Sequence, residues 1–161
     1  MKPKYNYHYN MIKGRVAEAI IKELFQVNGY RVYDYGMERT LPQAIGNVKN
    51  LKDEMAYRVR NMPDFLVQDI KSGVLNYVEV KYRVKGSFTL KDIENNPYET
   101  TCFIIVSKEN IQWISFAELT EGKILPASNE KNIENNTKFH LKNELISEYK
   151  AYAKAFFEGV K

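Results

Sequence analysis

The 161-residue sequence contains a single cysteine and no long apolar segment, and each absence excludes a class of protein. With Cys102 alone the chain cannot form an internal disulfide, which excludes a disulfide-stabilised scaffold. No apolar run approaches the roughly 20 residues that span a bilayer, and the first residues, rich in Lys and Tyr, lack the apolar centre of a secretory signal. We therefore expect a cytoplasmic protein that does not enter a membrane.

Several common functional motifs are also missing. The sequence has no P-loop, no zinc-type spacing of cysteines, no internal repeat and no segment with the composition of a linker. A hydrophobic content of 44% and an aromatic content of 13% are typical of a folded globule with a proper core. We expect one domain over residues 1–161, with its core at about residues 11–117 and a C-terminal helix at about residues 141–158.

What the sequence does contain is a charged pair on an apolar strand. Residues 75–84 alternate in character, with Val78 and Val80 on one side and Glu79 and Lys81 on the other. Side chains two apart on a strand share a face and lie about 6–7 Å from each other. Because burying an unpaired charge is costly, a divalent metal and a polar substrate would compensate this pair. The alternative is a solvated face that carries a weak ion pair.

A further carboxylate precedes this strand. Pro63-Asp64 opens an apolar run at residues 64–68, and proline suits the first position of a strand. The residues that follow the run are polar and turn-rich around Lys71-Ser72-Gly73, which predicts a hairpin. Such a hairpin would bring Asp64 beside Glu79, so that both carboxylates could bind one ion.

A third carboxylate lies on the first expected helix. Residues 11–28 have apolar side chains at helical spacing and are followed by a glycine that stops the helix. Glu18 lies on the flank of the apolar stripe. A strand at residues 30–35 and the hairpin would let Glu18 face the two strand carboxylates; alternatively, Glu18 pairs with Lys22 or Arg15.

Together these elements resemble the PD-(D/E)XK nuclease superfamily. The matching motifs are Gly14-x3-Glu18, Pro63-Asp64 and Glu79-Val80-Lys81. The opening Lys13-Gly14-x3-Glu18 is similar to that of archaeal Holliday junction resolvases. The segment Ser87–Asp92, after the strand, is similar to small domains found in restriction and defence systems. The compact resolvases lack the insertion of about 28 residues that this chain has before Asp64.

The resemblance implies a restriction-endonuclease-like α/β fold. Its core has the order αβββαβ, a mixed sheet flanked by helices, here with the insertion before the Pro-Asp strand and with the C-terminal helix. It also implies a metal-dependent DNA endonuclease that hydrolyses phosphodiester bonds, of the Holliday-junction-resolvase or the restriction and defence type. The alternatives are a non-catalytic nucleic-acid-binding subunit on the same fold within a larger complex, or a plain interaction domain.

The resemblance also assigns roles to the site residues. Asp64, Glu79 and the backbone carbonyl of Val80 would bind one or two Mg²⁺ or Mn²⁺ ions, which prefer oxygen ligands. Lys81 would orient or activate the attacking water, and Glu18 would hold a second ion or its water. DNA is the expected partner, and the oligomeric state is left open, with a homodimer among the alternatives.

The positive charge accompanies these motifs. Residues 1–90 contain 15 Lys and Arg against 9 Asp and Glu, whereas residues 91–161 contain 9 against 11. A basic excess is the electrostatic footprint expected of a protein that binds a phosphate backbone. The candidates for DNA contact are Arg83, Arg15, Arg58 and Arg60.

Two other segments could contact DNA or have a purely structural role. The tyrosine-rich segment at residues 5–9 is either an arm that stacks on bases or a terminal segment packed on its own domain. In the insertion, apolar residues at helical spacing between Val48 and Met62 predict a helix with basic flanks, although its Arg58–Arg60 end could instead be extended. We expect Trp113 to be a core residue rather than a stacking platform.

Past the motifs the expected elements are regular. A capping box at residues 89–92 predicts a short helix, and apolar runs at residues 101–107 and 111–116 predict two strands. Residues 126–138 are polar and predict a loop. The final helix is expected to have one apolar side, formed by Leu141, Leu145, Tyr149, Tyr152 and Phe156.

Overall fold

A five-stranded mixed sheet forms the centre of the computed structural model, which describes residues 2–160. The strands follow the order of the chain, and only β3 and β4 are parallel neighbours. Their bounds are β1 Tyr30–Asp34, β2 Phe65–Asp69, β3 Leu75–Tyr82, β4 Cys102–Val106 and β5 Ile111–Ser115. The expected α/β class, with a mixed sheet flanked by helices, is confirmed.

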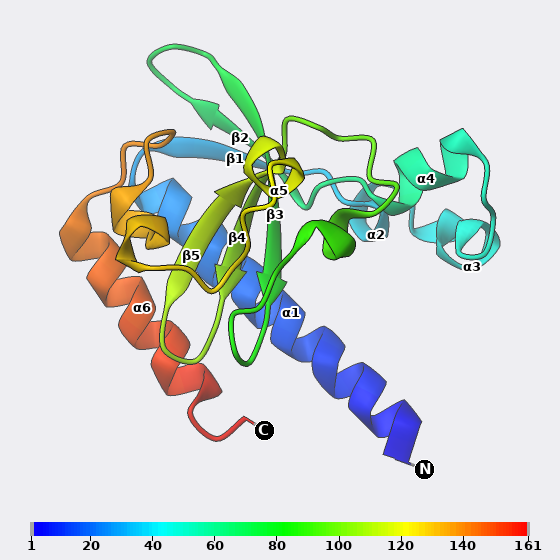
Figure 1. Cartoon of the computed structure of the whole chain (residues 1–161), viewed down its shortest axis with the longest axis horizontal. Helices are drawn as coiled ribbons and strands as arrows, with labels where there is room; N and C mark the ends of the chain where they lie inside the picture. The colour runs from blue at the N-terminus through cyan, green and yellow to red at the C-terminus, as the bar shows by residue number, and fades with distance from the viewer. Residues whose placement is uncertain (1, 161) are drawn as a thin grey trace.

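Helices cover both faces of this sheet (Figure 1). The long helix α1, Lys2–Val27, packs on β1 and β3, and α6, Asn143–Phe157, packs against α1 on the same face. The other face is covered by the 3₁₀ turn η2, Leu90–Ile93, and by α5, Phe116–Thr120, which enclose a second, smaller apolar cluster. Among residues 2–160, no helix combines the length and the apolar character needed to cross a bilayer.

Helix α1 begins earlier in the chain than its apolar stripe does. Ala17, Ile21 and Leu24 are fully buried on its inner side, which explains the helix predicted from residue 11 onward. The helix ends where the Asn28 side chain donates a hydrogen bond to the Leu24 carbonyl (2.7 Å). The tyrosine-rich segment at residues 5–9 is part of this helix, and its contact with bases stays a prediction.

The β2–β3 hairpin leaves part of β3 without a neighbour on one edge. Its turn is closed by Asp69, whose side chain accepts hydrogen bonds from the amides of Lys71 and Ser72 (2.7 and 3.0 Å). The register pairs Phe65, the first residue of β2, with Val78. Residues 79–82 therefore extend past the start of β2, and this open edge of β3 is where the candidate site lies.

The insertion between β1 and β2 forms short helices that project to one side of the sheet (Figure 1). They are α2 Met37–Thr40, the 3₁₀ turn η1 Pro42–Ala44, α3 Ile45–Val48 and α4 Glu54–Arg60. The single helix predicted between Val48 and Met62 is wrong, because the chain breaks at residues 49–53 and Asp53 caps α4 by accepting from the Ala56 amide (3.0 Å). The Arg58–Arg60 end is helical rather than extended.

The C-terminal half follows the expected order, with two differences. The capping box formed by Thr89 and Asp92 is present but opens the 3₁₀ turn η2, and the polar segment at residues 126–138 contains two further 3₁₀ turns, η3 Asn129–Lys131 and η4 Ile133–Asn135. Cys102 is fully buried, and Trp113 is a core residue, as expected.

The buried side of α6 differs from the predicted one. The buried residues are Ile146, Tyr149, Ala153 and Phe157, whereas Tyr152 and Phe156 are exposed. Leu141 and Leu145 are partly buried against the main core and Tyr149 is buried, so the prediction is confirmed there and is wrong at Tyr152 and Phe156. The true stripe faces the main core, where Phe157 stacks on Tyr82 with ring centroids 4.1 Å apart.

Candidate active site

One cavity of about 200 Å³ brings together residues from distant parts of the chain. Glu18 of α1, Asp64 before β2, and Glu79 and Lys81 of β3 all line it. Its other lining residues come from the segment after β1 and from the end of the insertion: Gly36, Met37, Glu38, Arg39, Arg60 and Met62. All four catalytic residues suggested by the sequence thus lie around one space at the open edge of β3.

Hydrogen bonds connect the Asp64 side chain to β3 and the Glu79 side chain to the backbone just before β2. The Asp64 amide donates to Glu79 Oε2 (3.0 Å), and the Val80 amide donates to Asp64 Oδ2 (2.8 Å). The carbonyl of Asp64 accepts from the amides of Tyr35 and Gly36 (2.9 and 3.3 Å). Side chains thus replace ladder hydrogen bonds where β2 has not yet begun, and both carboxylates are held at the fork between the strands.

Lys81 forms an ion pair with Glu79 inside the cavity. The two side chains are adjacent on one face of β3, and that of Glu79 is only 14% exposed. Burial alone would lower the pKa of Lys81, but the carboxylates of Glu79 and Asp64 outweigh it and raise this pKa above its ordinary value. Lys81 therefore stays protonated at neutral pH.

The surroundings of the other two carboxylates, Asp64 and Glu18, disfavour their charged forms. Burial raises the pKa of Asp64 well above its ordinary 3.8, and the nearby charge of Glu79 raises it further, against the smaller opposing effect of Lys81. Burial also raises the pKa of Glu18, although Arg39 opposes this shift. Both shifts indicate negative charge that the protein alone compensates incompletely.

Glu18 is paired with a residue that sequence reasoning missed. Arg39 Nη2 lies 3.6 Å from Glu18 Oε2, and Arg39 Nη1 lies 3.4 Å from Asp34 Oδ2. The suggested pairing of Glu18 with Lys22 is wrong, because Lys22 pairs with Asp34 instead (3.0 Å). The pairing suggested with Arg15 is not seen either. Arg39 lies in the insertion, and no local spacing in the sequence relates it to α1.

The donor atoms around the cavity suit a hard divalent cation. The amide of Val80 points to the open edge of β3, and its carbonyl points the same way because both groups of one strand residue face one edge. With Asp64, Glu79 and Glu18 this gives an all-oxygen donor set of the kind that Mg²⁺ prefers. Within residues 2–160, no three carboxylate, thiol or imidazole groups are yet gathered closely enough to hold an ion. Binding would therefore require side-chain movements that bring these carboxylates closer together.

Of the four arginines suggested for DNA contact, two lie at cavities. Arg60 lines the candidate site, but its guanidinium donates to the Val48 carbonyl (2.6 Å) and to the Leu51 carbonyl. Arg83, just past β3, lines an adjoining cavity and pairs with Asp92 (3.4 Å).

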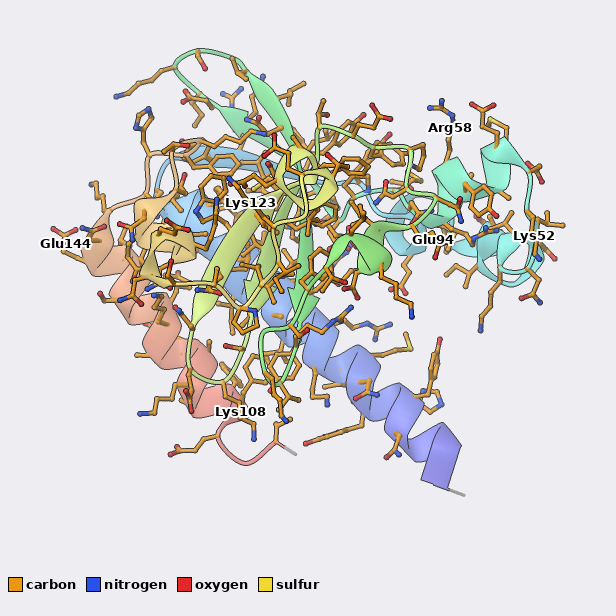
Figure 2. All side chains as sticks on the ribbon, viewed as in Figure 1. Lys52, Arg58, Glu94, Lys108, Lys123 and Glu144 are labelled. Atoms are coloured by element: carbon orange, nitrogen blue, oxygen red, sulfur yellow. The ribbon has the colours of Figure 1, made fainter. Side chains whose placement is uncertain are left out.

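The other two arginines lie elsewhere. Arg58 pairs with Glu54 on α4 (3.1 Å), and Figure 2 shows it on the projecting insertion. Arg15 is exposed on α1 and lines neither of these two cavities.

Comparison with known proteins does not assign this chain to a family. No protein-family model matches the chain, and no curated protein matches it in sequence. A function for this protein must therefore be argued from the residues that line the cavity and from their contacts.

Proposed function

We propose that this protein is a metal-dependent DNA endonuclease of the PD-(D/E)XK type. The observation that carries the proposal is the single cavity lined by Glu18, Asp64, Glu79 and Lys81, with Asp64 and Glu79 hydrogen-bonded across the fork between β2 and β3. A surface ion pair between Glu79 and Lys81 would not require two further acidic side chains, one of them with a strongly raised pKa, beside it.

The topology supports a restriction-endonuclease-like core. Helix α1 is followed by three antiparallel strands, and the chain then crosses to β4, which runs parallel to β3. This matches the order αβββαβ except at the crossover, where the 3₁₀ turn η2 stands in place of a full helix. The residues of the insertion add one wall of the cavity, including Arg39.

In the proposed reaction Asp64, Glu79 and the Val80 carbonyl would hold the ion, and Glu18 would hold a second ion or its water. When bound, Mg²⁺ or Mn²⁺ would lower the pKa of a water molecule and offset charge on the phosphate. Lys81, kept protonated by the two neighbouring carboxylates, would orient the attacking water and stabilise the negative charge that builds on the phosphate oxygens. The chain's own contribution is thus to position the donors and to keep one cation beside the reacting phosphate.

Melting and cleavage measured on the same protein test the proposal. Mn²⁺ should raise the melting temperature, because an ion that binds only the native state stabilises it by mass action. Asp64→Asn should lose both this response and cleavage. Glu94→Gln, which removes an exposed carboxylate that does not line the cavity, should keep both.

The substrates for this test are a four-way junction, a plain duplex and a single strand. Selective binding and cutting of the junction would favour a resolvase, and equal treatment of junction and duplex would favour a restriction-type nuclease. Binding without cutting by the wild-type protein in Mn²⁺ would favour the non-catalytic subunit. Neither binding nor cutting, together with melting that ignores Mn²⁺, would refute the proposal.

A further inference from the structure

A second cavity, of about 420 Å³, adjoins the candidate site. Glu18 and Lys81 line both cavities, so the two lie side by side. The second one lies between α1 and the end of β3, past the fork where Asp64 sits, and we refer to it as the α1 groove. It is lined by Asn10, Lys13, Gly14, Glu18, Val80, Lys81, Tyr82, Arg83 and Val84.

Lys13 in the α1 groove is a buried cation without a carboxylate partner. It is only 8% exposed, and none of the ion pairs or side-chain hydrogen bonds found among the described residues involves its ammonium. Its Nζ lies 5.0 Å from the ring centroid of Tyr9 and 5.5 Å from that of Tyr82. Aromatic faces attract a cation, but they compensate a desolvated charge less well than an anion does. The groove therefore holds a positive charge that an anionic ligand would stabilise.

At Gly14, the next residue, neither the packing nor the backbone conformation requires glycine. It lies inside the continuous helix α1, where glycine destabilises the fold relative to alanine. A Cβ at this position would meet nothing within 4 Å, and the backbone does not adopt a positive φ. The missing side chain therefore leaves open space on the groove side of the helix, which lets a bulky group approach the helix backbone.

We propose that Lys13 and Gly14 form a phosphate-binding subsite for the DNA strand that is cut, at a phosphate neighbouring the scissile one. This inference rests on the proposed nuclease function. Lys13 and Glu18 are separated by five positions on α1, about 7.5 Å along the helix axis. That spacing is on the scale of two nucleotides, since phosphates recur about every 3.4 Å along the axis of a duplex. Arg83 also lines the groove and would lie beside the same DNA strand.

Inorganic phosphate tests the Lys13 site without DNA. Phosphate should raise the melting temperature of the wild-type protein, and Lys13→Met should abolish the increase. Without phosphate, Lys13→Met should melt at a higher temperature than wild type, because it removes an uncompensated buried charge. The matched control is Lys154→Met, which removes an exposed charge on α6 and should keep the phosphate response. A lower melting temperature for Lys13→Met, with an intact phosphate response, would overturn the inference.

Gly14→Ala separates binding from folding. The substitution should raise the melting temperature by about 2–4 °C, because alanine is the better helix former, yet weaken DNA binding measured in Ca²⁺ by about tenfold, because a methyl group enters the path of the strand. Gly46→Ala is the matched control, since Gly46 also lies in a helix with nothing within 4 Å of a Cβ. It should keep full DNA affinity. Unchanged affinity for Gly14→Ala would contradict the inference.

Neutralising a single phosphate locates the contact. Once the cleavage position is mapped, a methylphosphonate at the neighbouring phosphate should weaken binding to wild-type protein about tenfold and to Lys13→Met hardly at all. Equal losses for both proteins would overturn the inference while leaving the nuclease proposal intact. If the wild-type protein neither binds nor cuts DNA, the nuclease proposal fails, and the phosphate melting experiment still decides whether Lys13 binds the anion.

Discussion

The candidate active site and the α1 groove adjoin each other, but they differ in how their charged side chains are paired. In the active site Lys81 pairs with Glu79, Glu18 pairs with Arg39, and Asp64 accepts from the Val80 amide. In the groove, the contacts that the described residues make with the Lys13 ammonium are those of the Tyr9 and Tyr82 rings. Groups that must keep a fixed geometry before substrate arrives need partners within the protein. A charged group that binds a ligand can remain unpaired until the ligand compensates its charge, although the free protein is then less stable.

The largest expected effect comes from replacing Lys81, the cation that is paired within the active site. Lys81→Met should lower the cleavage rate by about 10²–10⁴-fold, the range typical of a group that acts on the transition state. DNA binding measured in Ca²⁺ should change little, because the phosphates away from the scissile bond provide most of the affinity. Single-turnover cleavage and a gel-shift titration on the same duplex measure the two quantities.

Lys123→Met is the control for this experiment, since Lys123 pairs with Glu118 (3.4 Å) and lines neither cavity. It should cut at the wild-type rate. If Lys81→Met lost binding and cleavage equally, Lys81 would be a substrate-binding residue, and the distinction between the two cavities would fail.

The next largest effect concerns stability against pH in the presence of a chelator. The pKa of Asp64 is raised in the native state, so the folded protein binds its proton more tightly than the unfolded chain does. Stability from this group is therefore present at low pH and is lost as pH rises from the ordinary 3.8 through the raised native value. Glu18 shifts in the same direction.

Asp64→Asn should flatten this decline, and it should melt above wild type at neutral pH when no metal is bound. Melting curves across the acidic and neutral range measure both. Glu94→Gln should keep the wild-type pH dependence, because its carboxylate is exposed. Stability that rises with pH for wild type and Asp64→Asn alike would show that the cavity compensates its carboxylates fully.

The proximity of Asp64 and Glu79 could be predicted from the sequence because it depends on local features. A turn-rich segment between two alternating strands specifies a hairpin, and the alternation specifies which side chains share a face. The positions of β4, β5 and the buried Trp113 followed from the same patterns. What these residues do remains a prediction.

The parts that could not be predicted depend on tertiary contacts or on competing local signals. Arg39 reaches Glu18 from a different element, and Tyr82 comes from a distant part of the chain to lie beside Lys13. In the insertion, Asp53 forms a cap that breaks an apolar spacing otherwise typical of one helix. On α6 the prediction followed the large side chains of Tyr152 and Phe156, whereas the neighbouring Ala153 and Phe157 face the core.

A smaller effect distinguishes the groove from the insertion. Arg83→Gln should weaken DNA binding severalfold and reduce the slope of log affinity against log salt by about 1, since one fewer phosphate would be neutralised. Arg58→Gln should change neither quantity, because Arg58 lies on the projecting helix α4 and lines neither cavity. Titrations at several salt concentrations measure the slopes. Equal losses for both variants would mean that DNA extends over the insertion as well as the groove.

The smallest expected effect comes from Arg39, which, unlike Lys13, has carboxylate partners. Its pairs with Glu18 and Asp34 involve a side chain that is 47% exposed, so Arg39→Gln should change the free energy of unfolding by less than about 1 kcal/mol. If Arg39 occupies the place of a cation beside Glu18, its removal should lower the Mn²⁺ concentration needed for half-maximal cleavage. The titration is best done at mildly alkaline pH, where Glu18 is ionised in both proteins. Arg31→Gln, an exposed change on β1, is the control. A higher metal requirement would instead show that Arg39 positions Glu18 for the ion, and the active site would then depend on its internal partners even more than the comparison with the α1 groove suggests.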